Sequence, residues 1–77
     1  LSETMENMAD GLRAGQTLAE LKADAEKRIL AAGFNEVEYL DLRACDYLSL
    51  LETPTRPARL LAAVWLAGVR LIDNIAV

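Results

Sequence analysis

Apolar residues recur at helical spacing over the first 32 positions of the chain. Residues at i, i+3 and i+7 lie on the same side of an α-helix, so Met5, Met8 and Leu12 share one face. The pattern predicts two amphipathic helices, over residues 1–15 and 17–32, whose apolar faces pack on a common core. The apolar face of the second predicted helix consists of Leu18, Leu21, Ala25, Ile29 and Ala32.

The residues at the ends of these two segments match helix-capping chemistry. Ser2 is the expected N-cap of the first helix, and Gly15 is its expected stop. Thr17 and Glu20 form a T-x-x-E capping box, which satisfies backbone donors that a helix leaves unpaired at its start. Gly33 is the expected left-handed residue after the second helix. We therefore expect two separate helices.

An alternating segment follows the second helix. Successive side chains of a strand point to opposite faces, which places Val37 and Tyr39 on one face and Glu38, Leu40 and Leu42 on the other. The alternation is imperfect because charged residues interrupt it. It nevertheless predicts a strand of about seven residues over positions 36–42.

The middle of the chain gives a weaker signal. Residues 44–55 have no clear period, although Asp46 is placed to cap one helical turn over residues 47–48. Pro54 and Pro57 lie too close together for a helix or a central strand. This part of the chain is therefore predicted to be a connector.

Residues 59–77 form the most apolar part of the chain and support two interpretations. In the first, Pro57 opens a helix that Gly68 ends, and the alanines favour this helix by intrinsic propensity. In the second, residues 60–66 form a buried strand and residues 69–77 return beside it.

The second interpretation places a tight turn at Ala67-Gly68. It also explains why Val69, Leu71 and Ile75 fall on one strand face, with Asp73 as the only interruption. Local physics alone supports the two interpretations about equally.

Composition indicates one small domain with a partner. A chain of 77 residues buries only about 60% of the surface that it exposes when unfolded. Because 53% of its residues are hydrophobic, some apolar surface should remain exposed, and large exposed apolar patches mark contacts with partners. The longest uncharged run, residues 60–69, is about half the length of a membrane-spanning helix, so no membrane span is predicted.

Several kinds of chemistry are absent from the sequence. It contains no histidine, which removes histidine-assisted nucleophiles and the commonest metal ligand. A single cysteine, Cys45, excludes a paired-cysteine zinc site and suits a reducing cytosol; we expect it to be a small core residue. The net charge of −4 argues against nucleic acid as a partner. We therefore predict no catalytic residue and no metal site within this chain.

Four motifs lie in the order and spacing found in one enzyme family. They read M-A-D-G-L-R-A-G at 8–15, A-A-G-F at 31–34, Y-L-D-L-R-A-C-D at 39–46, and P-A-R-L-L-A-A-V-W-L followed by R-L-I-D-N-I at 57–75. Together they resemble the C-terminal domain of the pantoate–β-alanine ligases. The resemblance covers nearly the whole chain. One departure concerns the turn: the family places a glycine directly after the W-L pair, where this chain has Ala67.

The resemblance implies a fold and a place in a larger enzyme. It implies an α+β domain in which two main helices pack on one face of a three-stranded antiparallel sheet, which favours the strand interpretation of residues 60–66. Residues 1–77 are then one C-terminal lid domain, and Leu1, which is not an initiator methionine, suggests a piece of a longer cytoplasmic protein. The expected partner is the N-terminal catalytic domain of the same protein.

The resemblance also implies the chemistry of the intact enzyme. The family binds ATP and magnesium in its N-terminal domain, forms pantoyl adenylate and lets β-alanine displace AMP. The motifs for these steps are not in the present sequence, so the isolated domain is expected to be inactive. Its helix-free sheet face, with Leu61, Ala63 and Trp65, is expected to meet the catalytic domain.

Three arginines are the candidates for contact with ATP. Arg56, Arg59 and Arg70 are the only charges between positions 53 and 70, and all three are positive. They are able to screen phosphates on closure, but surface charges that guard a hairpin edge are a simpler interpretation. Asp73 and Asn74 are expected to pair locally. A different function class is a non-catalytic interaction module that forms a homodimer through an apolar sheet face.

Overall fold

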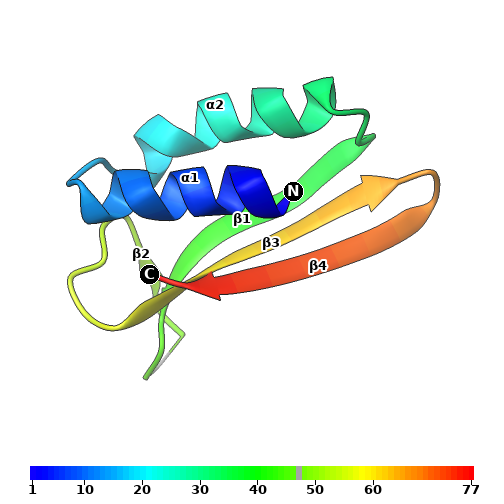
Figure 1. Ribbon diagram of the computed structural model, residues 1–77. Coiled ribbons are helices and arrows are strands. Elements are labelled where there is room, and N and C mark those ends of the chain that lie inside the picture. The colour runs from blue at the N-terminus through cyan, green and yellow to red at the C-terminus, as the bar shows by residue number, and fades with distance from the viewer. Residues whose placement is uncertain (47) are drawn as a thin grey trace.

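Two helices cover one face of an antiparallel sheet in the computed structural model, which describes residues 1–46 and 48–77 (Figure 1). The sheet order is β2-β1-β3-β4, and all neighbouring strands are antiparallel. The elements are α1 (Ser2–Arg13), α2 (Leu18–Ala31), β1 (Glu36–Ala44), β2 (Leu50–Leu51), β3 (Ala58–Leu66) and β4 (Val69–Ala76).

The predicted α+β class with two helices on one sheet face is confirmed, but the described residues form four strands where three were expected. The extra strand, β2, pairs with the end of β1 through Leu42–Leu51 and Arg43–Leu50. Its two residues are too few to create a periodic signal in the sequence. The helical turn predicted at Asp46 runs into Tyr47, which lies outside the described residues.

The helix boundaries follow the capping residues with one exception. Helix α1 begins at Ser2, and Leu1 occupies the N-cap position without a side-chain hydrogen bond, so the prediction of Ser2 as N-cap is wrong. Gly15 and Gly33 follow the two helices with φ of 102° and 104°, as expected for left-handed stops. Thr17 caps α2, because its hydroxyl oxygen accepts a hydrogen bond from the Glu20 N–H at 3.3 Å.

The core lies between the helix pair and the inner face of the sheet. Met5 and Leu12 of α1 and Ile29 of α2 are at most 1% exposed, as the helical pattern predicted. Ala32 is exposed because it lies beyond the last turn of α2, so its assignment to the apolar stripe is wrong. From the sheet, the core receives Leu40, Leu42, Ala58, Leu60, Ala62 and Val64.

A β-bulge near the start of β1 explains the imperfect alternation of that segment. Val37 pairs with Val64 and Tyr39 pairs with Ala63, so three residues of β1 lie opposite two of β3. The extra residue places Val37 on the same inner face as Leu40, and Val37 packs against the core. The prediction that Val37 faces away from Leu40 is therefore wrong. So is the prediction that Glu38 shares the face of Leu40, because Glu38 bonds to Trp65 and Arg70 on the opposite face.

Residues 58–76 form a β-hairpin, which confirms the strand interpretation of this segment. Strands β3 and β4 are joined by Ala67 and Gly68, whose φ values of 50° and 80° are those of a type I′ turn. The alanines of β3 favour a helix by local propensity. The segment is nevertheless extended, because it pairs with β1 and packs its inner face against the two helices.

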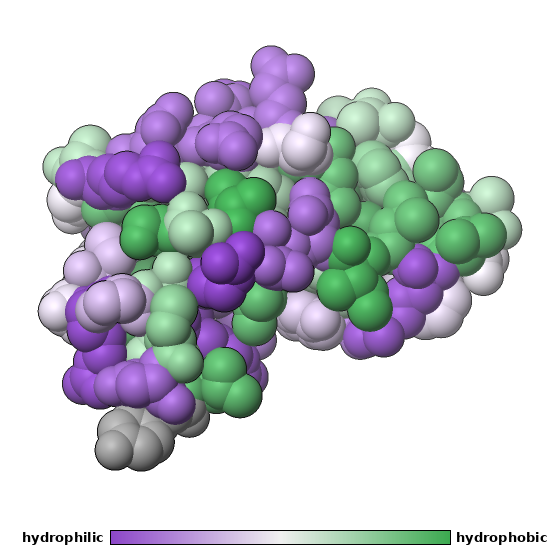
Figure 2. All heavy atoms as spheres, turned by 60° about the horizontal axis from the view of Figure 1, so that its bottom comes forward, coloured by the Kyte–Doolittle hydropathy of each residue, from purple (hydrophilic) through white to green (hydrophobic). Residues whose placement is uncertain are grey.

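The helix layer does not extend over the whole hairpin. We call residues 58–62 and 73–76 the hairpin root and residues 65–72 the hairpin tip. At the tip, Leu66 is 40%, Val69 57% and Ile72 61% exposed. Figure 2 shows hydrophobic side chains gathered at this end of the molecule, on the right. The exposed large hydrophobic residues of the described part are thus found at the tip, which carries Leu66, Val69, Leu71 and Ile72, and also elsewhere, at Leu30, Leu48 and Leu50.

Candidate functional site

The three candidate arginines do not come together. Arg56 forms an ion pair with Asp46 at 3.5 Å in the loop before β3. Arg59 lies at the hairpin root and Arg70 at the tip, because Arg59 pairs with Ala76 and Arg70 with Trp65. The Arg59–Ala76 pair and the Trp65–Arg70 pair are six residues apart along the strands, which corresponds to about 20 Å.

Each of these arginines is also engaged by a neighbouring side chain. Arg59 donates from Nε to Asn74 Oδ1 at 2.9 Å. Arg70 donates to both carboxylate oxygens of Glu38, at 3.1 and 2.7 Å, in a fork-like pair. A phosphate site needs convergent, uncommitted donors, and in this structure the three arginines neither converge nor stand without a partner. This geometry supports the alternative interpretation of charged groups along a hairpin.

Glu38 is the centre of a polar cluster on the helix-free face of the sheet. Besides Arg70, it accepts a hydrogen bond from the indole Nε1–H of Trp65 at 3.0 Å. The bonds from Arg70 and then Trp65 stabilise the carboxylate and hold the pKa of Glu38 below its ordinary value of 4.5. The hydrogen bonds that Arg70 donates to Glu38 also raise the pKa of Arg70. The cluster ties β1, β3 and β4 together at the start of the hairpin tip.

Asn35 fixes the hairpin turn from the loop between α2 and β1. Its side-chain oxygen accepts a hydrogen bond from the Ala67 N–H at 2.8 Å, and its own N–H donates to the Trp65 carbonyl at 2.7 Å. These bonds connect residues about thirty positions apart in the chain. The turn is therefore positioned by Asn35, which directly precedes β1, as well as by the turn residues themselves.

The helix-free face carries apolar and charged groups side by side. Leu61 and Trp65 are partly exposed on it, as predicted, and Ile72 adds a largely exposed side chain from β4. Ala63 is 0% exposed and offers no surface of its own, while the expectation that this face meets the catalytic domain stays a prediction. Ala63 lies between Tyr39 of β1 and Ile72 of β4, which are its partners in the sheet. This face has a partly apolar surface without a covering layer of helices.

The remaining candidate residues have local roles. Asp73 accepts the N–H of Asn74 at 2.8 Å, and Asn74 in turn accepts from Arg59, so the expected local pairing is confirmed. Cys45 is exposed, which makes its assignment to the core wrong. It follows β1 directly, at the point where the chain leaves the covered sheet.

The described part of the chain contains no group of three or more potential metal-ligating side chains. The start of α2 is not open to an anion either, because its first three N–H groups are occupied. Leu18 N–H donates to the Glu52 carbonyl at 2.8 Å, Ala19 N–H to Glu52 Oε1 at 3.0 Å, and Glu20 N–H to Thr17. None of the helices in the described part is long and apolar enough to cross a membrane.

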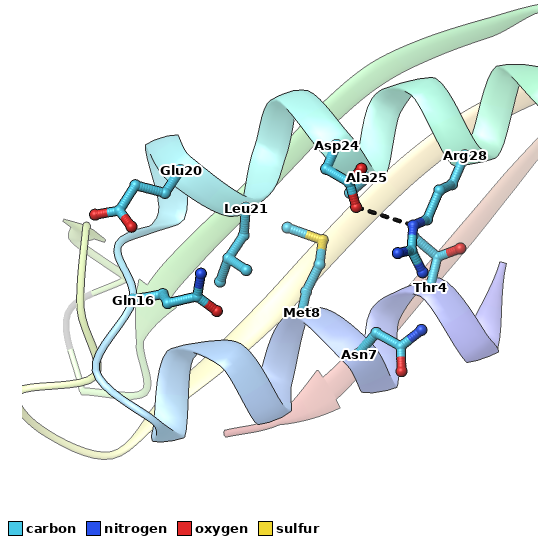
Figure 3. Close-up of a pocket in the computed structure, with 9 residues that line it drawn as sticks. All are labelled: Thr4, Asn7, Met8, Gln16, Glu20, Leu21, Asp24, Ala25 and Arg28. Atoms are coloured by element: carbon cyan, nitrogen blue, oxygen red, sulfur yellow. Dashed lines mark ion pairs between the residues drawn. The ribbon is translucent and has the colours of Figure 1, made fainter.

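An open groove of about 490 Å³ runs between α1 and α2 on the outer side of the helix layer (Figure 3). Its charged residues include Asp24 and Arg28, which pair with each other at 2.9 Å. Ligand sites are mostly apolar with a few convergent polar groups, whereas this lining is mainly polar. We therefore assign the groove no function. The lining comprises Thr4, Asn7, Met8, Gln16, Glu20, Leu21, Asp24, Ala25 and Arg28.

Three residues that organise the structure were missed in the sequence. Glu38 and Asn35 gave no periodic or motif signal, because their partners come from strands 27 to 32 positions later. Glu52 caps a helix that begins 34 positions earlier. Contacts across such separations are visible only once the sheet register is known.

Comparison with known proteins identifies the family. A family model described as pantoate-beta-alanine ligase matches residues 1–76. Curated pantothenate synthetases from Ruegeria pomeroyi, Roseobacter denitrificans and Chelativorans sp. are 53%, 51% and 51% identical to the chain over all 77 residues. The chain spans 27% of the length of each of these relatives. The match over nearly its whole length shows that the chain belongs to the pantoate–β-alanine ligase family.

Proposed function

We propose that this chain is the C-terminal lid domain of an ATP-dependent enzyme that joins pantoate to β-alanine. The observation that carries the proposal is the family match over residues 1–76 within relatives nearly four times as long. In this proposal the domain lies at the C-terminal end of a cytoplasmic enzyme and acts as a lid.

The chemistry of the chain supports a lid and not a catalytic centre. The sequence has no histidine, and the candidate arginines are paired and far apart. ATP and Mg²⁺ would then be held by the remainder of the enzyme. The lid would contribute surface and shape, while the reacting groups would belong to the larger part.

The helix-free sheet face is the surface that we assign to the contact. The inner face is occupied by α1 and α2, whereas Leu61, Trp65 and Ile72 leave apolar area exposed on the outer face. The Glu38–Arg70 pair stands beside them and neutralises its own charges. A surface of this kind can cover a site without bringing an unpaired charge to it.

The lid would protect a reactive intermediate from water. In the proposed reaction, the pantoate carboxylate attacks the α-phosphate of ATP and releases pyrophosphate, and the amine of β-alanine then displaces AMP from the acyl adenylate. An acyl adenylate is readily hydrolysed, so closure over it favours transfer to β-alanine. A lid therefore improves the yield of pantothenate for each ATP consumed.

The proposal is tested by comparing the intact ligase with a form that ends before the residues corresponding to this chain. We expect pantothenate formation to fall sharply in the shortened enzyme and to be undetectable for the 77-residue chain alone. Circular dichroism of the shortened enzyme is the control for its folding. A folded, shortened enzyme that forms pantothenate at the rate of the intact one would overturn the proposal.

A further inference from the structure

Strand β4 is an edge of the sheet, and half of its backbone groups point away from it. The two-residue turn makes Leu66 and Val69 a hydrogen-bonded pair, and such pairs alternate along an antiparallel ladder. Residues 69, 71, 73 and 75 therefore bond to β3. The residues whose N–H and C=O groups point outward are Arg70, Ile72, Asn74 and Ala76.

Two observed hydrogen bonds agree with this alternation. The N–H of Val77, the next inward position, donates to the Ala58 carbonyl at 3.0 Å. The carbonyl of Ala76, an outward position, accepts from Arg13 Nη2 at 3.1 Å, and Arg13 belongs to α1 and not to β3. The outward row of β4 is therefore assigned from the register and from its contacts.

The root half of this edge is covered by side chains. Arg13 occupies the Ala76 carbonyl, and Asp73 Oδ1 accepts the outward N–H of Asn74 at 2.8 Å. An approaching strand would have to break these bonds to pair there. Such side-chain cover is a known way to prevent sheet edges from associating.

The tip half of the same edge is open. Within residues 1–46 and 48–77, no group bonds to the outward N–H and C=O groups of Arg70 and Ile72. The adjacent side chains are apolar and accessible, with Leu71 37% and Ile72 61% exposed. The opposite edge differs, because β2 has only two residues and offers little to pair with.

We propose that the tip half of β4 pairs with the same segment of a second copy of the chain, across a two-fold axis beside Leu71. In this register, Arg70 and Ile72 exchange backbone hydrogen bonds with Ile72 and Arg70 of the second copy. The two Leu71 residues face each other as a non-hydrogen-bonded pair, in which side chains approach most closely. The inference goes beyond the proposed function and does not depend on it.

The distribution of open and covered groups selects this register. An axis beside Leu71 uses only the groups of Arg70 and Ile72, whereas an axis beside Ile72 would require the N–H of Asn74, which Asp73 already holds. The contact is isologous, so one patch satisfies both copies.

Charge does not oppose the contact. Arg70 of each copy is neutralised by its own Glu38 at 2.7 Å, so two guanidinium groups can lie diagonally across the axis without facing each other unpaired. The side chains at the centre, Leu71 and Ile72, are both apolar. Because a single strand edge buries little area, the pairing should be weak and dependent on concentration.

Backbone amide exchange tests the proposal on the 77-residue chain. NMR-detected hydrogen exchange is measured from about 10 μM to about 1 mM, a range that spans weak association, with light scattering on the same samples. The expected result is a dimer at high concentration in which Arg70 and Ile72 amides gain at least about tenfold protection, the effect of 1.4 kcal/mol. The inward amides of Leu71 and Asp73 are internal controls, since β3 protects them at all concentrations.

The other outcomes would overturn the proposal. A chain that stays monomeric throughout the series has no self-pairing edge. A dimer that leaves the Arg70 and Ile72 amides unprotected associates through a different surface. Protection that arises only when the remainder of a pantoate–β-alanine ligase is added would assign the edge to that partner and not to a second copy.

A matched pair of lysine variants gives an independent readout. Leu71→Lys places two like charges against each other at the centre of the contact, and we expect it to weaken dimerisation at least about tenfold. Leu50→Lys alters a leucine on the opposite edge that is more exposed, at 63% against 37% for Leu71, and should leave dimerisation unchanged. Equal dimerisation of Leu71→Lys and the unaltered chain would contradict the proposed axis.

Discussion

The root and the tip of the β3–β4 hairpin are made from similar residues but have different surroundings. At the root, Leu60 is 0% exposed and lies beneath the helices. At the tip, Leu66 and Leu71 are 40% and 37% exposed although they lie on the same face of the hairpin. The difference shows that burial in this domain depends on where the helix layer ends and not on how apolar the strand is.

Element lengths explain where the helix layer ends. A helix of 12 residues, such as α1, is about 18 Å long, whereas a nine-residue strand such as β3 is about 30 Å long. Because α1 starts above the middle of β4, the last part of the hairpin extends past it (Figure 1). The tip is held instead by Asn35 and by the Glu38 cluster.

The largest expected effect separates the two ends directly. Leu60→Ala removes a fully buried side chain at the root and should lower the free energy of unfolding by about 2–5 kcal/mol, because a cavity remains. Leu71→Ala at the tip leaves no closed cavity and should cost about 1 kcal/mol. Urea denaturation measures both variants. Equal losses would contradict the distinction between root and tip.

The helix that covers the root depends on its N-terminal cap. Thr17→Ala removes the acceptor of the Glu20 N–H and should lower the free energy of unfolding by about 1 kcal/mol. Ser2→Ala is the matched control, because Ser2 makes no capping bond and its replacement should change stability very little. Thermal or urea unfolding decides between them, and a larger loss for Ser2→Ala would reverse the assignment of the caps.

The turn at the tip should be improved by one substitution. Ala67 has φ of 50°, which costs an alanine about 1 kcal/mol relative to glycine. Ala67→Gly should therefore raise the free energy of unfolding by about 0.5–1 kcal/mol, whereas Gly68→Ala should lower it. Urea unfolding gives both values, and a destabilising Ala67→Gly would show that the turn is not of type I′.

The smallest expected effect is the loss of stability at low pH that follows protonation of Glu38. Because the pKa of Glu38 is lowered in the folded state, its contribution to stability is present above the unfolded value and is lost as pH falls through the folded pKa, below 4.5. The indole N–H resonance of Trp65, the single tryptophan, should shift with the same titration. In Arg70→Gln, the midpoint should move upward toward 4.5. An unmoved midpoint would remove Arg70 as the main cause.

The sequence predicted the helices and the core beneath them well, and it predicted the rest of the sheet less well. The helices, the caps at Thr17 and Gly33, and the core positions of α1 follow from local periodicity. Residues 60–66 were ambiguous locally, and the resemblance to a family supported the strand that the structure contains. The strand β2 and the bulge that turns Val37 inward depend on register with partners distant in the chain.

The candidate site was less predictable than the fold. Arg56, Arg59 and Arg70 are consecutive charges along the sequence, but they are separated in space. Arg59 lies at the root of the hairpin and Arg70 at its tip. Glu38, which engages Arg70, gave no signal in the sequence since it lies 32 positions earlier. Pairing between distant charges can be read only from the sheet register.

We proposed that this domain covers a reactive intermediate with its helix-free sheet face, and the ratio of the reaction products is a direct test of that role. In an intact ligase that carries this domain, the ratio of AMP released to pantothenate formed is measured for Ile72→Arg, with Leu30→Arg on the outer side of α2 as the matched control. Our account predicts a ratio near one for the control and a clearly higher ratio for Ile72→Arg, because water reaches the intermediate. A ratio of one in both variants would contradict it.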